Sequence, residues 1–130
     1  MQDKIAKLKS IKILFVEDEE DLCGIISDTL QKLQANFETA NNGKIAFERF
    51  QEVKDFDLIV TDINMPVMNG LELIKAIRDT NSDIPVIIMS AHTEPEYIKS
   101  AEELGVKNYL LKPFDFIKFI NLVSEIDFNK

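Results

Sequence analysis

Apolar residues gather along the chain in short runs that have the length of β-strands. Four runs are almost continuously apolar, which is typical of strands buried on both faces of a sheet. A fifth run alternates between polar and apolar residues and ends at the turn Asn41-Asn42-Gly43, so we expect it to lie nearer an edge. The five predicted strands cover residues 11–16, 36–40, 57–62, 84–90 and 106–111.

Between these runs, apolar residues recur at the spacing of one face of an α-helix. Such patterns cover residues 71–77, 94–104 and 116–126, and the pattern at 94–104 has the thinnest apolar face. Strands that alternate with helices predict right-handed crossovers onto a parallel sheet, which is an α/β fold. The first helical pattern, which precedes these three, consists of Leu22, Ile25, Ile26, Thr29, Leu30 and Leu33.

Chemically active side chains follow the predicted strands at the points where the strands end. In parallel α/β sheets, ligands bind beyond the carboxyl ends of the strands, where the strand order reverses. Three carboxylates, a hydroxyl and an ammonium would meet at this edge. Asp57 flanks the third strand too, but at its start, roughly 16 Å away. The residues at the carboxyl ends are Glu17, Asp18, Asp62, Ser90, Ala91 and Lys112.

Each of these acids has an ordinary interpretation when it is taken alone. Glu17, Asp18 and the acids at 19–21 could complement the dipole of a helix N-terminus, and Asp62 could start a turn. These interpretations do not explain why the groups converge on one edge. Crowded carboxylates repel one another unless a cation intervenes, and Mg²⁺ takes one or two carboxylates together with backbone oxygen, water and phosphate. A carboxylate can also accept a phosphoryl group, and Asp62 is the best-placed acceptor because its strand is central.

Composition limits the classes of function. With 130 residues of which 45% are hydrophobic, the chain can form one domain, which we expect at residues 11–126. Residues 1–10 should be a flexible leader or a short helical turn, and residues 127–130 a tail. The net charge of −8 opposes direct nucleic-acid binding. A single cysteine and the lack of a signal sequence or membrane-length apolar run predict a cytoplasmic protein without membrane insertion.

Four motifs together resemble the receiver domain of two-component response regulators, and the single-domain chemotaxis receivers are closest in appearance. The motifs are LFVEDE, DLIVTDINMPVMNGLEL, PVIIMSA and YLLKPF, and the resemblance covers residues 11–126. It implies a flavodoxin-like (βα)5 fold with a doubly wound, five-stranded parallel sheet of strand order 2-1-3-4-5. It also implies that Asp62 takes a phosphoryl group from a histidine kinase or a histidine phosphotransfer protein.

The resemblance assigns the metal site and the acceptor. Asp62 would be the phosphoacceptor. Mg²⁺, with Mn²⁺ as an alternative ion, would be bound by Asp18, Asp62 and the backbone carbonyl of Asn64. Glu17 stands where many members have aspartate, so its contact with the metal is either direct or through water. Lys112 would contact a phosphoryl oxygen, and the bond between Lys112 and Pro113 is usually cis in the family.

The remaining roles concern the response to phosphorylation. The hydroxyl of Ser90 would move toward the phosphoryl group, Ala91 would keep access open, and Tyr109 would turn inward as the switch residue. Asn64 and His92 flank the path of the hydrolytic water, so we expect them to tune the lifetime of the phosphoryl group. The surface formed by residues 94–126 would bind a downstream target or a fused effector, and the chain would be a monomer or a weak dimer through this surface.

Two enzyme classes use similar residues and fit the sequence less well. A Toprim-like nuclease requires a second aspartate where this chain has Asn64. A phosphatase of the haloacid dehalogenase class requires a D-x-D-x-T motif that is absent. We therefore expect a signalling protein that catalyses only its own phosphorylation and dephosphorylation.

Overall fold

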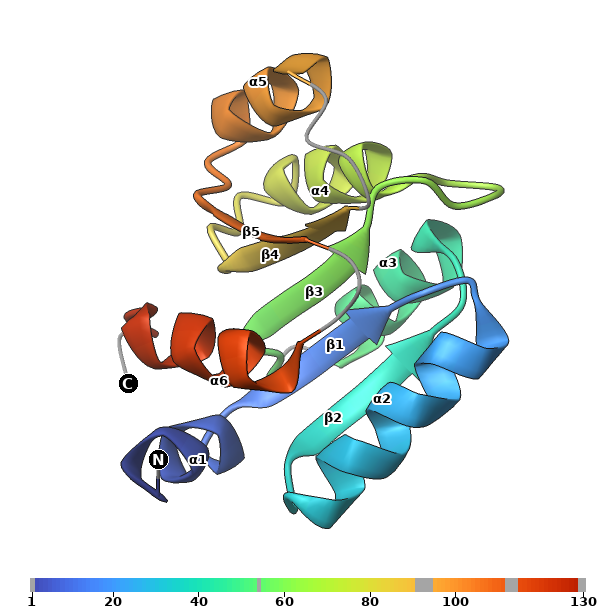
Figure 1. Ribbon diagram of the computed structural model, residues 1–130. Coiled ribbons are helices and arrows are strands. Elements are labelled where there is room, and N and C mark those ends of the chain that lie inside the picture. The colour runs from blue at the N-terminus through green and yellow to red at the C-terminus, as the bar shows by residue number, and fades with distance from the viewer. Residues whose placement is uncertain (1, 54, 91–94, 112–114, 129–130) are drawn as a thin grey trace.

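The computed structural model describes residues 2–53, 55–90, 95–111 and 115–128, apart from the side chains of Ser90 and Pro95 (Figure 1). Its strands are β1 (Lys12–Val16), β2 (Asn36–Ala40), β3 (Leu58–Asp62), β4 (Val86–Ser90) and β5 (Asn108–Leu111). Its helices are α1 (Gln2–Lys9), α2 (Glu20–Lys32), α3 (Gly43–Glu52), α4 (Gly70–Arg78), α5 (Pro95–Glu103) and α6 (Phe116–Glu125). Among the described residues, no helix combines the length and the apolar character needed to cross a membrane.

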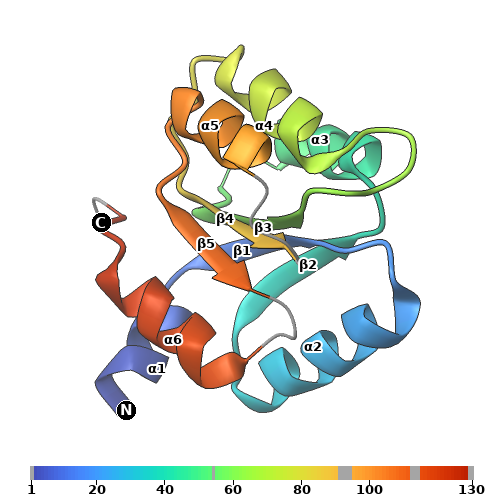
Figure 2. The same cartoon turned by 45° about the horizontal axis from the view of Figure 1, so that its top comes forward.

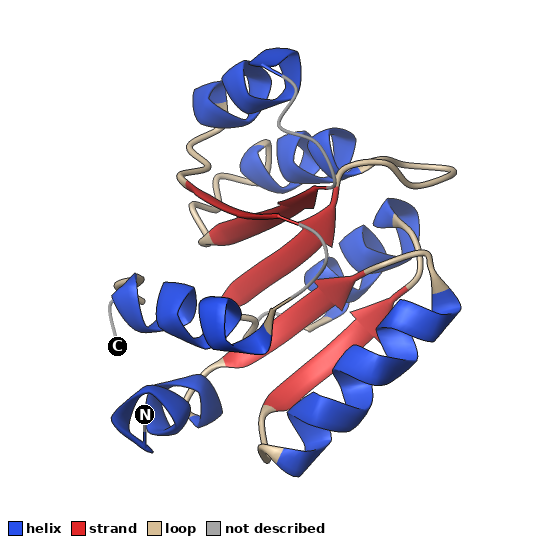
Figure 3. Cartoon of the chain, viewed as in Figure 1, coloured by secondary structure: helices blue, strands red, loops and turns tan. Residues whose placement is uncertain are grey.

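The five strands form one parallel sheet in the order β2-β1-β3-β4-β5, which confirms the predicted fold and strand order. Helices cover both faces of the sheet: α1, α2 and α6 lie on one face and α3, α4 and α5 on the other (Figures 2 and 3). β3 is central, and all five of its residues are buried. Its continuous apolar run is therefore explained by helices packed on both of its faces.

The structure corrects the predicted apolar face of α2. Ile26 and Leu30 are fully buried, but the side chain of Ile25 is 61% exposed. Adjacent helical residues point about 100° apart, so a helix that buries Ile26 and Leu30 against the sheet turns Ile25 toward solvent. The sequence pattern gave the orientation of the helix correctly but overestimated the width of its buried face.

The segment expected to be a flexible leader or a short helical turn contains a helix of eight residues that packs on the core. Residues 2–9 form α1, Leu8 is 0% exposed within the core, and Ile5 packs against the same cluster. The ammonium of Lys7 donates to the backbone carbonyls of Ser124, at 2.9 Å, and Ile126 at the end of α6. A cation at a helix C-terminus satisfies carbonyls that have no partner within the helix. Burial of Leu8 and Ile5 and the bonds from Lys7 to the end of α6 therefore hold α1 against the core, although α1 has few apolar residues.

The side chain of Arg78, at the end of α4, binds three backbone carbonyls in two segments of the chain. Nε donates to the carbonyl of Leu104 at 2.7 Å, and Nη1 donates to the carbonyls of Ser82 at 3.1 Å and Ile84 at 2.8 Å. Burial lowers the pKa of the guanidinium, while the charge of Asp83 acts in the opposite direction. Arg78 therefore joins α4, the start of β4 and the turn after α5.

We expect Arg78→Ala to lower the free energy of unfolding by roughly 3 kcal/mol, because it leaves three partly buried carbonyls without their charged donor. Urea unfolding followed by circular dichroism measures the change. The control is Lys75→Ala in the same helix, whose ion pair with Asp79 is exposed and should contribute at most about 0.5 kcal/mol. Equal effects of the two substitutions would contradict the role given to Arg78.

We expect Leu8→Ala to lower the free energy of unfolding by about 3 kcal/mol, because it leaves a cavity in the core. The same urea measurement applies, with Lys9→Ala as the control, since Lys9 is exposed and its ammonium donates to the exposed side chain of Gln34. An unchanged unfolding midpoint in Leu8→Ala would show that α1 does not pack in solution.

Candidate functional site

Carboxylates from two adjacent central strands meet at the carboxyl edge of the sheet. Val16 in β1 pairs with Thr61 in β3, so the next residues, Glu17 and Asp62, lie in line with each other. One carboxylate oxygen from each of Glu17, Asp18 and Asp62 lies within 4.8 Å of the others. The structure thus brings together the three acids that the sequence analysis placed at this edge.

Burial makes this cluster electrostatically costly. Glu17 is 1% exposed and Asp62 is 8% exposed, whereas Asp18 is exposed. Two ionised carboxylates 4.8 Å apart at an effective dielectric constant of about 20 repel by roughly 3 kcal/mol. A hard divalent cation that prefers oxygen ligands relieves this repulsion, so the donor set fits Mg²⁺.

Backbone groups fix the orientation of the two buried acids. Oδ1 of Asp62 accepts the backbone N–H of Ile63 at 2.7 Å. Oε1 of Glu17 accepts the backbone N–H of Glu19 at 3.3 Å, and the backbone N–H of Glu17 donates to the carbonyl of Ala40 at 3.0 Å. Rigid backbone elements therefore hold both carboxylates close together, which is what a preorganised ion site requires.

The other acids of these segments stabilise the backbone rather than join the cluster. Glu20 and Asp21 lie in the first turn of α2, where negative charge complements the helix dipole. Asp57 lies at the opposite end of β3: its Oδ2 accepts the backbone N–H of Lys12 at 2.9 Å, and its own N–H donates to the carbonyl of Lys12. Asp57 thus fastens the start of β3 to β1 and takes no part in the acidic cluster.

The loop at residues 63–69 leads from Asp62 to α4 and carries Asn64. It ends in a capping box in which the side chains of Asn69 and Glu72 each accept the other residue's backbone N–H. Within the loop, Val67 has φ 71°, and the N–H of Met68 donates to the carbonyl of Pro66 at 2.8 Å, which makes a tight γ-turn. A β-branched residue with positive φ is strained, and because no glycine or asparagine stands at this position, the turn could not be predicted from residue type.

Several predicted site residues cannot be compared with the structure. Ala91, His92, Lys112 and the proposed cis bond to Pro113 lie outside the described residues, as does the side chain of Ser90. The backbone of Ser90 ends β4 directly after Met89, the residue that pairs with Asp62. Ser90 itself pairs with Leu111, the last residue of β5. The register therefore brings the ends of β4 and β5 to the same edge as the acidic cluster.

Tyr109 lies on β5 and faces α5 rather than the acids. Its hydroxyl is 3.4 Å from the carbonyl oxygens of Ile98 and Val106, and it is half-buried. Burial raises the pKa of this hydroxyl above its ordinary value, and the charge of Glu102 acts in the same direction. The side chain is thus a neutral donor that connects the edge strand to the backbone of α5.

Comparison with known proteins agrees with the observed fold. Residues 13–124 match the response regulator receiver domain family. The two-component response regulator ARR10 of Arabidopsis thaliana is 36% identical over 117 residues, which are 89% of this chain but only 21% of that protein. The chemotaxis protein CheY1 of Helicobacter pylori is 36% identical over 107 residues, covering 80% of this chain and 86% of that protein.

A solved structure shows the same fold. The chemotaxis protein CheY4 of Vibrio cholerae superposes with a TM-score of 0.78 at 33% identity, covering 87% of this chain and 98% of that one. The match to the family spans most of the chain. The chain belongs to the response regulator receiver domain family.

Proposed function

We propose that the chain is a phosphoacceptor signalling domain in which Asp62 receives a phosphoryl group from a phosphohistidine of a partner protein. The partner is a sensor histidine kinase or a histidine phosphotransfer protein. The observation that carries this proposal is the convergence of Glu17, Asp18 and Asp62 within 4.8 Å at the carboxyl edge of the sheet. We assign the domain to residues 11–126, with α1 and the tail at 127–130 as flanking segments.

Of the three acids, Asp62 is the best suited to be the acceptor. Glu17 is 1% exposed against 8% for Asp62, so a phosphohistidine on another protein reaches it less readily. Asp18 is exposed, so water competes for its carboxylate. Asp62 lies at the end of the central strand, and one of its oxygens is held by the N–H of Ile63. This fixed orientation favours attack by the carboxylate on phosphorus while the bond to the imidazole nitrogen breaks.

The metal ligands that we propose are Asp18, Asp62 and the backbone carbonyl of Asn64, with Glu17 bound directly or through water. A bound Mg²⁺ supplies positive charge for the phosphoryl oxygens, which carry most of the charge in a loose transition state. In the same scheme, the ammonium of Lys112 contacts a phosphoryl oxygen. Ala91 is small enough to leave the acceptor accessible.

Ser90 and Tyr109 would transmit the modification to the surface at residues 94–126. The hydroxyl of Ser90 binds the phosphoryl group, and Tyr109 then leaves its contacts with the backbone of Ile98 and Val106. Loss of these bonds loosens α5, whose buried contact rests on the small Ala101. Asn64 and His92 would set how quickly water removes the phosphoryl group, so that the protein dephosphorylates itself.

We expect Asp62→Asn to abolish labelling by acetyl phosphate in the presence of Mg²⁺, because the amide cannot form the acyl phosphate. Intact-mass spectrometry detects the added phosphoryl group. Asp57→Asn is the matched control: it keeps an acceptor oxygen for Lys12 and lies at the other end of β3, so its labelling should equal that of the wild type. Labelling of Asp62→Asn at the wild-type rate would reject the acceptor.

We expect beryllofluoride with Mg²⁺, which mimics the bound phosphoryl group, to change amide hydrogen exchange in α5, β5 and α6. The physical reason is that the hydroxyl of Tyr109 links β5 to α5 through a weak contact with the carbonyl of Ile98 at 3.4 Å, so the link is easily broken. The amides at the start of β1, far from the site, serve as the internal control. Exchange that changes only around residues 17–18 and 62–64 would contradict the proposed output surface.

A further inference from the structure

A short turn joins the two loops that carry the acidic residues. Residues 40–43 connect β2 to α3, and their backbone bonds to the β1–α2 loop on one side and to the β3–α4 loop on the other. The backbone N–H of Glu17 donates to the carbonyl of Ala40 at 3.0 Å. The backbone N–H of Gly43 donates to the carbonyl of Met68 at 3.1 Å. The turn is therefore a spacer between the loop that bears Glu17 and Asp18 and the loop that follows Asp62.

We propose that Gly43 is a positioning residue for the metal site, because its lack of a side chain lets the 63–69 loop approach closely enough for its backbone to face the acids. This inference rests on the proposed function of the acidic cluster. Gly43 touches neither the metal nor the phosphoryl group in this scheme. It acts through the backbone of Met68.

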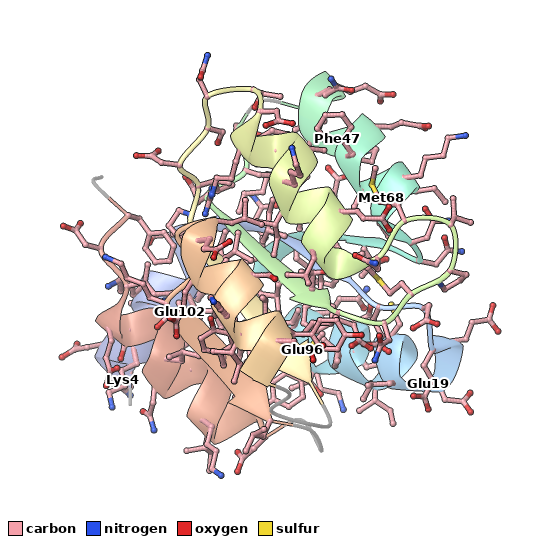
Figure 4. All side chains as sticks on the ribbon, turned by 90° about the horizontal axis from the view of Figure 1, so that it is seen from above. Lys4, Glu19, Phe47, Met68, Glu96 and Glu102 are labelled. Carbon is pink, nitrogen blue, oxygen red and sulfur yellow. The ribbon has the colours of Figure 1, made fainter. Side chains whose placement is uncertain are left out.

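The contact between Gly43 and Met68 leaves no space for a side chain. A Cβ atom at Gly43 would lie 2.5 Å from the carbonyl oxygen of Met68 and 2.9 Å from its Cγ. The Cγ could move away, but the oxygen belongs to the backbone, so the loop itself would have to shift. Figure 4 shows Met68 beside α3, close to Phe47. The loop thus rests directly on the first residue of α3.

The turn itself has little freedom to yield. Gly43 is buried, and the side chain of Asn42 accepts the backbone N–H of Ile45 at 2.9 Å, which fixes the start of α3. Ala40 is the last residue of β2 and pairs with Val16. A Cβ at Gly43 would consequently displace the loop rather than the turn.

The other end of the loop is also fixed. The N–H of Gly70 donates to the carbonyl of Ile63 at 2.8 Å, and a Cβ at Gly70 would overlap with the carbonyl oxygen of Asp62. Between these points lie residues 64–67, where Val67 is already in a strained conformation. A displacement of Met68 is therefore passed to residues 64–67, which include Asn64, whose carbonyl is the proposed backbone ligand.

The test is the affinity for Mg²⁺, measured by titration of the ¹⁵N-labelled chain and followed through amide chemical shifts. We expect Gly43→Ala to bind Mg²⁺ roughly tenfold more weakly than the wild type, the lower end of the usual effect of residues that orient metal ligands. Acetyl phosphate labelling of the same variant should slow in parallel at subsaturating Mg²⁺ and recover toward the wild-type rate at saturating Mg²⁺. A variant that is less stable but still folded, as Leu8→Ala should be, would label at the wild-type rate at both Mg²⁺ concentrations.

Two variants serve as controls. Gly24→Ala adds the same methyl group in α2, where a Cβ would meet no atom within 4 Å, so its Mg²⁺ affinity should equal that of the wild type. Leu8→Ala lowers stability at the opposite end of the sheet and should also leave the affinity unchanged. A weakened affinity in Gly43→Ala alone supports the proposal, whereas an affinity within twofold of the wild type overturns it and leaves the proposed function intact.

A measurement on the wild-type chain decides the matter if Gly43→Ala does not fold. Mg²⁺ should slow hydrogen exchange at the amide of Gly43, because the bound ion would hold the loop against the turn. Exchange at this amide that does not respond to Mg²⁺ overturns the inference. Absence of any Mg²⁺ binding by the wild-type chain overturns the proposed site, and this inference with it.

Discussion

Repulsion between buried carboxylates is the constraint on which the arrangement of this protein depends. Glu17 and Asp62 are among the least exposed polar residues, and Asp18 completes a cluster within 4.8 Å. Apolar strands that end in acids at one edge are costly to fold unless a cation or a proton compensates the charge. In the proposed function this cost is useful, because a divalent cation that relieved the repulsion would also prepare one carboxylate to accept a phosphoryl group.

Backbone geometry, rather than side-chain packing, holds the acids in place. Main-chain hydrogen bonds fix Glu17 and Asp62 at the ends of their strands, and the loop after Asp62 is held at Gly70 and Gly43. Side chains of ordinary size at these two glycines would collide with carbonyl oxygens of the loop. The acidic cluster and the loop beside it are therefore held by close approach of peptide groups, which leaves their oxygen atoms little room to move.

The helices α6 and α5 differ in how firmly they are held. Leu8 of α1 is buried in the core and Lys7 of α1 caps the end of α6, so α6 is tied to a helix that is itself part of the core. By contrast, β5 is an edge strand, and the hydroxyl of Tyr109 contacts the backbone of α5 at the carbonyl of Ile98, 3.4 Å away. A change at the acidic edge is thus expected to move α5 and β5 more readily than the part of α6 that α1 covers.

Periodicity and residue type in the sequence determined the strands, the parallel sheet and the edge at which the acids gather, because continuous apolar runs require burial on both faces and parallel strands end together. The sequence did not determine that Ile25 faces solvent or that Leu8 lies in the core, since each depends on which neighbouring element covers it. Nor did it mark the positive φ of Val67, where the usual glycine or asparagine is absent. The close approach of Gly43 to Met68 joins segments distant in the chain, so only the tertiary structure decided it.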